Sequence, residues 1–224
     1  MKLSVIVPLL NEARELPGLL ERLSPLIRNG SEVIVVDGGS DDGSAQIAER
    51  AGFTVVRASR GRARQMNAGA SQASGDVLLF LHADTQLPDA AETAIAHGLA
   101  DSGRVWGRFD VRITGRSPML RVVGCLMNVR SRLTGIATGD QAMFVTRPAF
   151  DAVGGFPDQP LMEDIELSLR LRKGSAPACL RQQVTTSDRR WERDGVWRTI
   201  ALMWRLRWLY WTGTPPERLA KLYE

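Results

Sequence analysis

Acidic side chains follow three apolar segments of the sequence, at the points where those segments end. Glu12 comes after LSVIVPLL, Asp37 closes EVIVVD, and Asp84 closes DVLLFLHAD. If the segments are parallel strands of one sheet, their carboxyl ends meet at one edge and the three carboxylates converge there. Such an edge suits a divalent cation, which takes oxygen ligands, and also the hydrogen-bond donors of a nucleoside.

Aspartate at a strand end has a simpler explanation, because it is a favoured cap for the helix that follows. Capping is the preferred interpretation for Asp41 and Asp42 in the turn GGSDDGS. Asp84 differs, because it ends the most apolar segment, where a charge is costly unless it is hydrated, paired or metal-bound. The spacing His82-x-Asp84 leaves a metal-ligand role open for His82, so both residues are candidates for a metal site.

A second acidic pair, Glu163 and Asp164, opens a helical pattern in MEDIELSLRLRK. Acids in the first turn and basic residues in the last turn stabilise a helix through its dipole, which explains the pair without any further function. The alternative is that one carboxylate faces the strand edge as a general base, since a buried member of an adjacent pair acquires a shifted pKa. The residues alone leave both interpretations open.

Three arginines, Arg60, Arg62 and Arg64, precede or begin a predicted helix in SRGRARQMNAG, near the same strand edge. Guanidinium groups at that place can hold a diphosphate through paired hydrogen bonds. Backbone amides at the start of the helix also attract an anion. A solvated basic face is the commoner outcome for such arginines, and it stays open for each of them.

The elements that would position these residues alternate along the chain. Apolar runs at 3–10, 32–37, 54–59 and 76–84, separated by helical patterns, predict a parallel sheet covered on both faces. From 105 to 113 the odd positions are mostly apolar and the even ones mostly polar, which predicts an antiparallel strand near an edge with one solvated face. A helix at about 119–133, a strand at 142–146 and a helix from 163 are predicted beyond it. The fold class is α/β, with one domain over 1–194 and a helical tail over 195–224.

The amino-acid composition excludes several classes of protein. The 224 residues are 44% hydrophobic and 24% charged, which is ordinary for a globular domain and excludes a disordered chain or a coiled coil. Cys125 and Cys179 are far apart, which excludes a cysteine zinc site and favours a reducing compartment. The net charge of +4 favours anionic partners weakly, and no basic block long enough for a nucleic-acid arm occurs. The N-terminal apolar run is too short for a signal peptide or a membrane span, so we expect a cytoplasmic or membrane-surface protein.

The C-terminal tail is rich in tryptophan and arginine. Four of the six tryptophans fall in VWRTIALMWRLRWLYWTG, where arginines interrupt the apolar residues and exclude a membrane span. This composition is typical of an interfacial helix that lies on an acidic bilayer. A helix docked on the domain or on a second copy of it, with its arginine head groups in water, is the alternative.

Four segments in this order resemble glycosyltransferase family 2, whose fold is called GT-A. They are VIVPLLNE, VIVVDGGSDDGS, LLFLHADT, and GGF followed by MEDIELSLRL, and the resemblance extends to about Trp191. The sequence is most similar to a small bacterial subgroup with FLHADT, GDQ and RRW motifs. The resemblance implies an inverting transferase that moves a sugar from a nucleoside diphosphate, such as UDP or GDP, to a hydroxyl of an acceptor. By the same resemblance, Pro8, Glu12 and Asp37 line the nucleoside pocket, and Arg62 or Arg64 approaches the base or the phosphates.

The resemblance also implies a metal and a base. Asp84 matches the last acid of the DxD motif, which holds Mn²⁺ or Mg²⁺ against the diphosphate, and Asp164 matches the base of the ED motif, with Glu163 beside it. The sequence departs from the family at three places: His82 replaces the first acid of DxD, Gly38 replaces the second Asp of VDDGS, and SDRRW replaces QxxRW. The last departure favours addition of a single sugar over polymer synthesis.

Two other functions stay open. A sugar-nucleotide nucleotidyltransferase has a related α/β layer, but it carries a glycine-rich, arginine-containing loop after the first strand, where this chain has PLLNEARELPG. A non-catalytic protein that binds a sugar nucleotide or a membrane surface is disfavoured by the presence of Asp84 and the Glu163–Asp164 pair. The residues at His82 and Gly38 keep it open.

Overall fold

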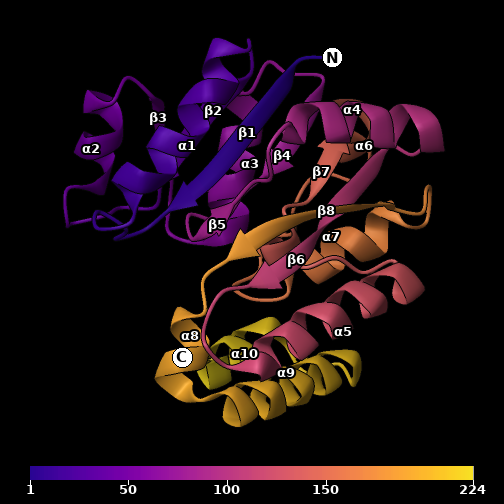
Figure 1. Cartoon of the computed structure of the whole chain (residues 1–224). Helices are drawn as coiled ribbons and strands as arrows, with labels where there is room; N and C mark the ends of the chain where they lie inside the picture. The colour runs from indigo at the N-terminus through magenta and orange to yellow at the C-terminus, as the bar shows by residue number, and fades with distance from the viewer. Residues whose placement is uncertain (224) are drawn as a thin grey trace.

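The computed structural model describes residues 1–223, which form a mixed eight-stranded sheet with helices on both faces (Figure 1). The strand order across the sheet is β3-β2-β1-β4-β7-β6-β8-β5. The strands are β1 (Leu3–Leu9), β2 (Glu32–Asp37), β3 (Thr54–Arg57), β4 (Val77–Phe80), β5 (Thr85–Gln86), β6 (Trp106–Ile113), β7 (Phe144–Thr146) and β8 (Ala178–Thr186). The helices are α1 (Leu16–Arg28), α2 (Ser44–Arg50), α3 (Arg62–Gln72), α4 (Ala91–Ser102), α5 (Pro118–Thr134), the 3-10 helix η1 (Gly139–Gln141), α6 (Arg147–Ala152), α7 (Glu163–Leu171), α8 (Arg189–Asp194), α9 (Val196–Trp211) and α10 (Pro216–Tyr223).

The first half of the sheet is parallel, as the apolar runs predict. β1 pairs in parallel with β2 on one side and with β4 on the other, and β2 pairs with β3. All seven residues of β1 are buried, because helices cover both faces, and the one polar side chain among them, Ser4, donates to Glu32 Oε2 at 2.6 Å. The register places Leu9 opposite Asp37, so the ends of β1 and β2 meet at one edge of the sheet.

The second half of the sheet corrects one prediction. β6 lies inside the sheet, antiparallel to β7 and parallel to β8, and not at an edge. The face expected to be solvated is buried instead: Arg108 is fully buried and Asp110 nearly so. The alternation of polar and apolar residues was misleading because α5 covers that face, and the two charged side chains pair with each other beneath it. The strand β8, which pairs with β6, was not predicted.

Helices α9 and α10 pack against the rest of the chain at the lower end of the view in Figure 1. Leu206 of α9 and Leu219 of α10 are fully buried in one cluster with Met162 and Ile165 at the start of α7. The hydroxyl of Tyr210 donates to Glu166 Oε2 of α7 at 3.2 Å. The C-terminal helices therefore reach the helix that begins with Glu163 and Asp164.

Candidate active site

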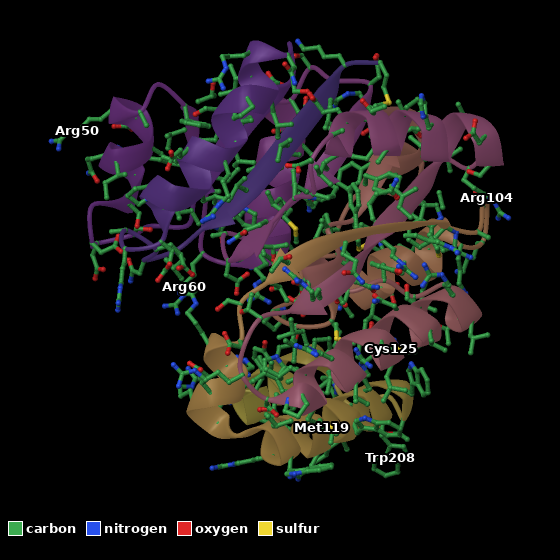
Figure 2. The ribbon with its side chains drawn as sticks, in the orientation of Figure 1. Arg50, Arg60, Arg104, Met119, Cys125 and Trp208 are labelled. Atoms are coloured by element: carbon green, nitrogen blue, oxygen red, sulfur yellow. The ribbon has the colours of Figure 1, made fainter. Side chains whose placement is uncertain are left out.

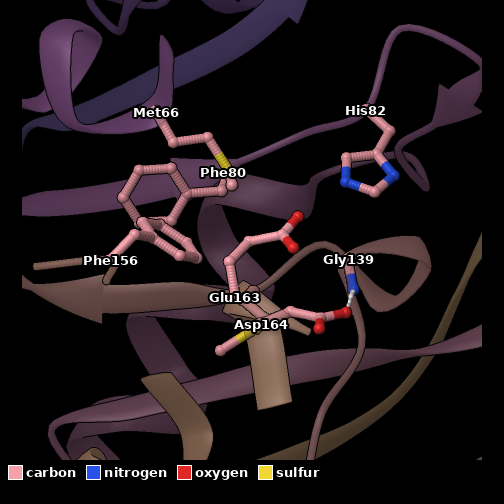
Figure 3. Close-up of a pocket in the computed structure, with 8 residues that line it drawn as sticks. Met66, Phe80, His82, Gly139, Phe156, Glu163 and Asp164 are labelled. Carbon is pink, nitrogen blue, oxygen red and sulfur yellow. Dashed lines mark hydrogen bonds between the residues drawn. The ribbon is translucent and has the colours of Figure 1, made fainter. Parts of the chain in front are cut away.

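A pocket lies where the end of β4, the 3-10 helix η1 and the start of α7 meet (Figure 3). It is lined by Met66, Phe80, His82, Gly139, Met143, Phe156, Glu163 and Asp164. The structure thus brings His82 together with the Glu163–Asp164 pair, although these residues are far apart in the sequence. The aromatic wall is held in place by Asn67 of α3, whose side chain donates to Phe156 O at 2.8 Å and accepts from Phe156 N at 3.0 Å.

Backbone amides hold the carboxylate of Asp164. Its Oδ2 atom accepts from Gly139 N at 2.8 Å, and its Oδ1 atom accepts from Ile165 N at 2.7 Å. Each oxygen keeps a further lone pair for a proton or a substrate hydroxyl. The residue before the helix, Met162, has a φ of 66°, a left-handed conformation that is strained for a side chain of this kind. This turn aims the first two residues of α7 at the pocket.

Glu163 is buried beside Asp164, with 4% of its surface exposed. Burial, and then the negative charge of Asp164, raise the pKa of Glu163 from its ordinary 4.5 to about 7, although Arg62 and His82 act in the opposite direction. At neutral pH this carboxyl is therefore partly protonated. The neutral form lets the adjacent Asp164 carry the negative charge without a second one beside it.

His82 packs edge-on against η1. A Cβ atom at Gly139 would lie 2.2 Å from Cε1 and 2.3 Å from Nε2 of the imidazole, so only glycine allows this contact. His82 Nδ1 lies 3.5 Å from Asp140 Oδ1. Burial opposes the charge of Asp140, but the hydrogen bond and charge of His82, followed by Arg62 and Arg190, lower the pKa of Asp140 below its usual range. Gly139 and Asp140 were not among the predicted site residues. Both belong to the GDQ motif, which was the signal in the sequence that could have indicated them.

Glu12 and Asp84 meet at the neighbouring strand edge through Arg189 of α8. Arg189 Nη1 lies 3.1 Å from Glu12 Oε2, and Arg189 Nη2 lies 3.8 Å from Asp84 Oδ2. The expected convergence of these two acids is therefore present in the structure. Arg189, the first arginine of the RRW motif, was not among the predicted site residues.

Asp37 and Pro8 lie behind this edge. Asp37 is buried, and its carboxylate accepts from the backbone N–H groups of Gly39 and Ser40 at 3.1 to 3.3 Å. Pro8 is buried within β1 opposite Val36. Both residues shape the end of the first two strands.

The turn after β2 contains one of the departures from the family pattern. A Cβ atom at Gly38 would lie 2.9 Å from the side chain of Gln65, which is buried. Gln65 Nε2 donates to the carbonyl oxygens of Leu9 and Val36 at 2.7 and 2.8 Å. The amide of Gln65 thus fills the space into which a longer side chain at position 38 would extend.

The prediction that Asp41 or Asp42 caps the helix after this turn is wrong, because the N-cap of α2 is Gly43 and no side chain caps it. Asp42 Oδ1 accepts from the N–H of Ser44, the first residue of α2, at 3.0 Å. Its other oxygen accepts from Ala13 N at 2.8 Å. Asp42 therefore holds the loop after β1 against the start of α2.

The three arginines near α3 have different environments. Arg60 is exposed and points away from the sheet (Figure 2). Arg64 forms an ion pair with Asp158 at 2.7 Å, which ties α3 to the loop before α7. Arg62, the first residue of α3, is exposed, and its guanidinium group forms no ion pair within residues 1–223.

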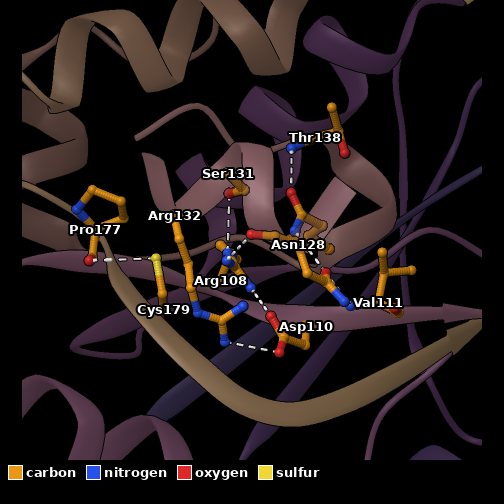
Figure 4. Close-up of polar contacts among 10 residues, drawn as sticks. Arg108, Asp110, Val111, Asn128, Ser131, Arg132, Thr138, Pro177 and Cys179 are labelled. Carbon is orange, nitrogen blue, oxygen red and sulfur yellow. Dashed lines mark hydrogen bonds and ion pairs between the residues drawn. The ribbon is translucent and has the colours of Figure 1, made fainter. Parts of the chain in front are cut away.

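A network of buried polar side chains supports η1 from behind (Figure 4). Asp110 accepts from both Arg108 and Arg132, and the Nε atom of Arg108 donates to Ser131 at 3.0 Å. Asn128 of α5 makes two hydrogen bonds with the backbone of Val111, at 2.8 and 3.0 Å.

The network reaches the pocket through Gln141 of η1. Gln141 is fully buried, and its Nε2 atom donates to Asn128 Oδ1 at 3.3 Å. The other end of η1 is Gly139, whose N–H holds Asp164. The position of the Asp164 carboxylate therefore depends on side chains of β6 and α5.

Within residues 1–223, no group of three or more His, Cys, Asp or Glu side chains converges closely enough to hold a metal ion. Asp84, with about one third of its side chain exposed, offers one carboxylate at the strand edge. This fits the way in which Mg²⁺ and similar ions are often bound, through one or two carboxylates and the phosphates of a substrate. It does not fit a metal that is held by protein side chains alone.

Residues 4–150 match the profile of "Glycosyl transferase family 2". A relative from Yersinia pestis, an undecaprenyl-phosphate 4-deoxy-4-formamido-L-arabinose transferase, is 28% identical over 152 residues, which are 62% of this chain and 46% of the relative. The chain thus spans less than half the length of that relative.

Solved structures resemble the fold at low sequence identity. S. aureus TarS 1-349 in complex with UDP matches with a TM-score of 0.68 at 20% identity, over 84% of this chain and 60% of that one. The mannosyltransferase PcManGT from Pyrobaculum calidifontis, in complex with GDP-Man and Mn²⁺, matches with a TM-score of 0.61 at 23% identity, over 82% and 56% of the two chains. The second is a mannosyltransferase by its name, and the likeness identifies the fold as the one that these structures share.

Proposed function

The chain belongs to glycosyltransferase family 2, and from that membership we propose that it transfers a single sugar from a nucleoside diphosphate to a hydroxyl of an acceptor, with inversion at the anomeric carbon. The observation that carries the proposal is the pocket that joins His82 to Glu163 and Asp164, beside the edge where Glu12 and Asp84 meet. In this arrangement a carboxylate can accept a proton, and the polar edge of the sheet can bind a nucleotide.

Asp164 is the general base in this proposal. The acceptor hydroxyl must lose a proton as it attacks the anomeric carbon, and Asp164 is fixed by the amides of Gly139 and Ile165 with lone pairs left to receive it. Attack from the side opposite the leaving diphosphate passes through an oxocarbenium-like transition state and inverts the centre. Glu163, with its pKa raised to about 7 by burial and by Asp164, acts by leaving the negative charge on Asp164.

Mn²⁺ or Mg²⁺ is the proposed cofactor. Asp84 would hold the ion together with the donor diphosphate, and His82 is the second candidate on the same segment. A bound divalent cation supplies Lewis-acid stabilisation of the negative charge on the leaving diphosphate. Arg189 adds a fixed positive charge at this edge, where it already contacts both Glu12 and Asp84.

The donor is a nucleoside-diphosphate sugar, and UDP and GDP are the nucleotides present in the similar structures. Pro8, Glu12 and Asp37 are the residues proposed for the nucleoside, because they lie at the joined ends of β1 and β2. Arg62 is favoured over Arg64 for the phosphates, since Arg64 is engaged by Asp158 whereas Arg62 forms no ion pair within residues 1–223.

A nucleotide panel tests this proposal directly. Thermal unfolding is measured with UDP, GDP, UTP and GTP, each with and without Mn²⁺, and products are sought by mass spectrometry after labelled sugar donors are added to a lysate. We expect metal-dependent stabilisation by a diphosphate and the appearance of a labelled glycoside. A preference for a triphosphate would instead indicate a nucleotidyltransferase, and diphosphate binding without any product would indicate a non-catalytic binding protein.

We also propose that the protein acts at the cytoplasmic surface of a membrane, through a surface formed by α5 and α9. These helices lie side by side, since Val123 and Met127 of α5 pack in one cluster with Val196 and Ile200 of α9. Each helix carries three arginines and no acidic residue. The α5–α9 face is the set of exposed large apolar residues on them, namely Val122, Leu126, Val129, Leu133, Trp197, Trp204, Trp208 and Trp211.

The composition of the α5–α9 face supports an anionic bilayer as its partner. Trp204, Trp208 and Trp211 are 63 to 73% exposed, and Figure 2 shows Trp208 pointing away from the chain. Tryptophan with arginine is favoured at the boundary between lipid and water. No helix among residues 1–223 has both the length and the apolar composition that a membrane span needs.

Vesicle co-sedimentation tests the membrane contact. The wild type and a Trp204→Ser, Trp208→Ser double variant are pelleted with phosphatidylglycerol vesicles and with phosphatidylcholine vesicles. We expect the wild type to pellet with the anionic vesicles and the variant to stay in solution. Equal pelleting of both proteins would contradict the proposal, and a change from dimer to monomer in the variant would assign the α5–α9 face to a second copy of the chain.

A further inference from the structure

The two backbone segments that hold the carboxylate of Asp164 rest on one hydrophobic cluster. Its buried residues lie just before η1, around the start of α7, and on the C-terminal helices α9 and α10, namely Ile136, Leu161, Met162, Ile165, Leu206 and Leu219. The side chains of Leu206 and Leu219 are fully buried. Most of the partly buried residues that pack against the cluster also belong to α9 and α10. The C-terminal helices thus supply much of the apolar support beside the proposed base.

The turn before α7 depends on this support because of Met162. Its φ of 66° is a left-handed conformation, which persists in a residue with a long side chain only where the surrounding packing fixes it. The Met162 side chain is buried in the cluster. The hydroxyl of Tyr210 in α9 also donates to Glu166 Oε2 in the first turn of α7, at 3.2 Å. Loss of this packing lets the turn relax, so that the Asp164 carboxylate leaves the two backbone N–H groups that fix it.

Few residues of the C-terminal helices are buried. α9 has 16 residues, of which Thr199 and Leu206 are buried, and α10 has 8 residues, of which Leu219 is buried. α3, by comparison, buries five of its 11 residues, and it packs on β1 and β2. Elements with few buried apolar residues open at a low cost in free energy while the rest of the protein stays folded. We therefore treat α9 and α10 as an element with a docked and an undocked state.

The docked state also completes the α5–α9 face. α5 is held without help from α9, because Asn128 makes two hydrogen bonds with the backbone of Val111 and Ser131 accepts from Arg108 of β6. The exposed tryptophans of α9 lie beside the exposed apolar residues of α5 only while α9 packs against that helix. A bilayer that binds the continuous face therefore binds the docked state more tightly than the undocked state and shifts the equilibrium toward it.

We propose that α9 and α10 couple an anionic bilayer to the proposed base: contact with the bilayer favours the docked state, in which Leu206 and Leu219 are positioning residues for Asp164. This inference rests on the proposed function, because it takes Asp164 as the base and the α5–α9 face as the membrane contact. The acids of the donor edge, Glu12 and Asp84, are not members of the cluster. The bilayer thus regulates the step in which the acceptor loses its proton and leaves nucleotide binding unchanged.

Amide hydrogen exchange of the full chain tests this coupling without any transfer activity. The reporter segments are 136–141 and 161–166, which contain the N–H groups that hold Asp164, and the reference segment is 37–44 after β2. In the absence of lipid, Leu206→Ala should accelerate exchange in both reporter segments about tenfold or more and leave the reference segment unchanged. Leu206→Met keeps the volume of the side chain and should exchange like the wild type. Reporter segments that exchange in Leu206→Ala as they do in the wild type would overturn the proposal.

Two further variants separate positioning from a general loss of stability. Leu23→Ala truncates a buried leucine of α1 in a different cluster, so it should destabilise the protein without accelerating the reporter segments. Equal acceleration by Leu23→Ala and Leu206→Ala would overturn the proposal, because the segments would then open only with the whole protein. Tyr210→Phe keeps the ring and removes only the hydroxyl bond to Glu166, so it should fold even if Leu206→Ala does not, and it should accelerate the 161–166 segment. In a transfer assay, Leu206→Ala should lower kcat and keep KM for the donor within about twofold.

The exchange measurement is then repeated with phosphatidylglycerol vesicles and with phosphatidylcholine vesicles. We expect the anionic vesicles to slow both reporter segments of the wild type and to have no effect on those of the Trp204→Ser, Trp208→Ser double variant. Anionic vesicles that bind the wild type but leave exchange unchanged, or accelerate it by drawing α9 out of the cluster, would overturn the proposal. Vesicles that do not pellet with the wild type would overturn it together with the membrane contact. Absence of sugar transfer would count against the transferase activity alone, because exchange still measures the coupling between the bilayer and the segments that hold Asp164.

Discussion

The two halves of the sheet bury different kinds of side chain. β1, β2 and β4 bury aliphatic residues on both faces, and the acid near their edge, Asp37, is held by backbone N–H groups of its own turn. β6 instead carries Arg108 and Asp110 into the interior, where α5 supplies their partners. The first half is thus a frame stabilised by apolar burial, whereas the second half fixes the position of Asp164 through polar side chains. Changes in the two halves should therefore have different consequences.

The largest effect on activity is expected at Asp164, whose carboxylate is positioned by the second half of the sheet. Asp164→Asn removes the proposed base but keeps the shape of the side chain and one acceptor oxygen, so the rate of sugar transfer should fall about 10²- to 10⁴-fold. The affinity for UDP or GDP with Mn²⁺ should change less than twofold, because the donor edge belongs to the other half. The measurements are release of nucleoside diphosphate and calorimetric binding.

Asp151→Asn is the matched control, since Asp151 is exposed on α6 and has no role in the pocket. A rate for Asp164→Asn within threefold of the wild type would remove Asp164 from the mechanism. Loss of nucleotide binding in Asp164→Asn would contradict the assignment of nucleotide binding to the first half of the sheet and of the base to the second half.

Asp110→Asn should have the next largest effect, by leaving the fully buried Arg108 without a full counter-charge. Removal of one partner from a buried ion pair costs about 3–5 kcal/mol of the free energy of unfolding. The comparison is with Leu79→Ala in β4, where a fully buried leucine is truncated at a cost of about 2–5 kcal/mol. Denaturant unfolding measures both, and the exposed Asp101→Asn serves as a neutral control.

The two destabilised variants should differ in activity. Asp110→Asn disturbs the network that ends at Gln141 and Gly139, so the activity per folded molecule should also fall. Leu79→Ala should keep its activity at temperatures where it is folded. Equal activities per folded molecule would show that the polar network stabilises the second half without positioning the base.

A smaller effect with a distinct pH dependence is expected for Glu163→Gln. The pKa of Glu163 is raised in the folded protein from 4.5 to about 7, by burial and then by Asp164, so folding disfavours its ionised form. The wild type should therefore lose stability as the pH rises from about 4.5 through 7, and the loss from this group should level off by about pH 8. The full shift corresponds to about 3 kcal/mol, and Glu163→Gln should abolish the loss.

Unfolding in denaturant at pH 5, 6, 7 and 8 measures this difference, with Glu217→Gln on an exposed position of α10 as the control. The substitution itself changes the free energy of unfolding by an amount that does not depend on pH. Beyond that amount, Glu163→Gln should gain stability relative to the wild type as the pH rises from 5 to 8. Parallel pH profiles would contradict the buried, shifted state of Glu163.

The first half of the molecule could be predicted from the sequence because its pattern is local. Runs such as EVIVVD are apolar on both faces, and residues that end them fall at one edge by topology alone, as Glu12 and Asp84 do around Arg189. The second half could not, because the burial of Arg108 and Asp110 depends on residues of α5 that are distant in sequence. A period of two in such a strand does not distinguish solvent from a buried partner.

The same reasoning applies to the site. The start of α7 at Glu163 was predicted, because acids in a first turn are a local signal. The arginine at 189 and the glycine at 139 were not, since each acts only through a contact with a distant segment, Arg189 with Glu12 and Gly139 with the imidazole of His82. The roles assigned to the individual residues of the site stay predictions.

The smallest effect is expected in the first half of the sheet. There the buried polar side chain of Gln65 joins β1 and β2. Gly38→Ala places a methyl group 2.9 Å from the amide of Gln65, which must shift and weaken its hydrogen bonds to Leu9 O and Val36 O. Overpacking of this kind costs about 1–3 kcal/mol. In a Gln65→Ala background the same substitution meets no such side chain, so its cost should disappear. A double-mutant cycle in denaturant would measure the coupling, and a cost for Gly38→Ala that is the same in both backgrounds would show that the glycine is required by the backbone of the turn and not by Gln65.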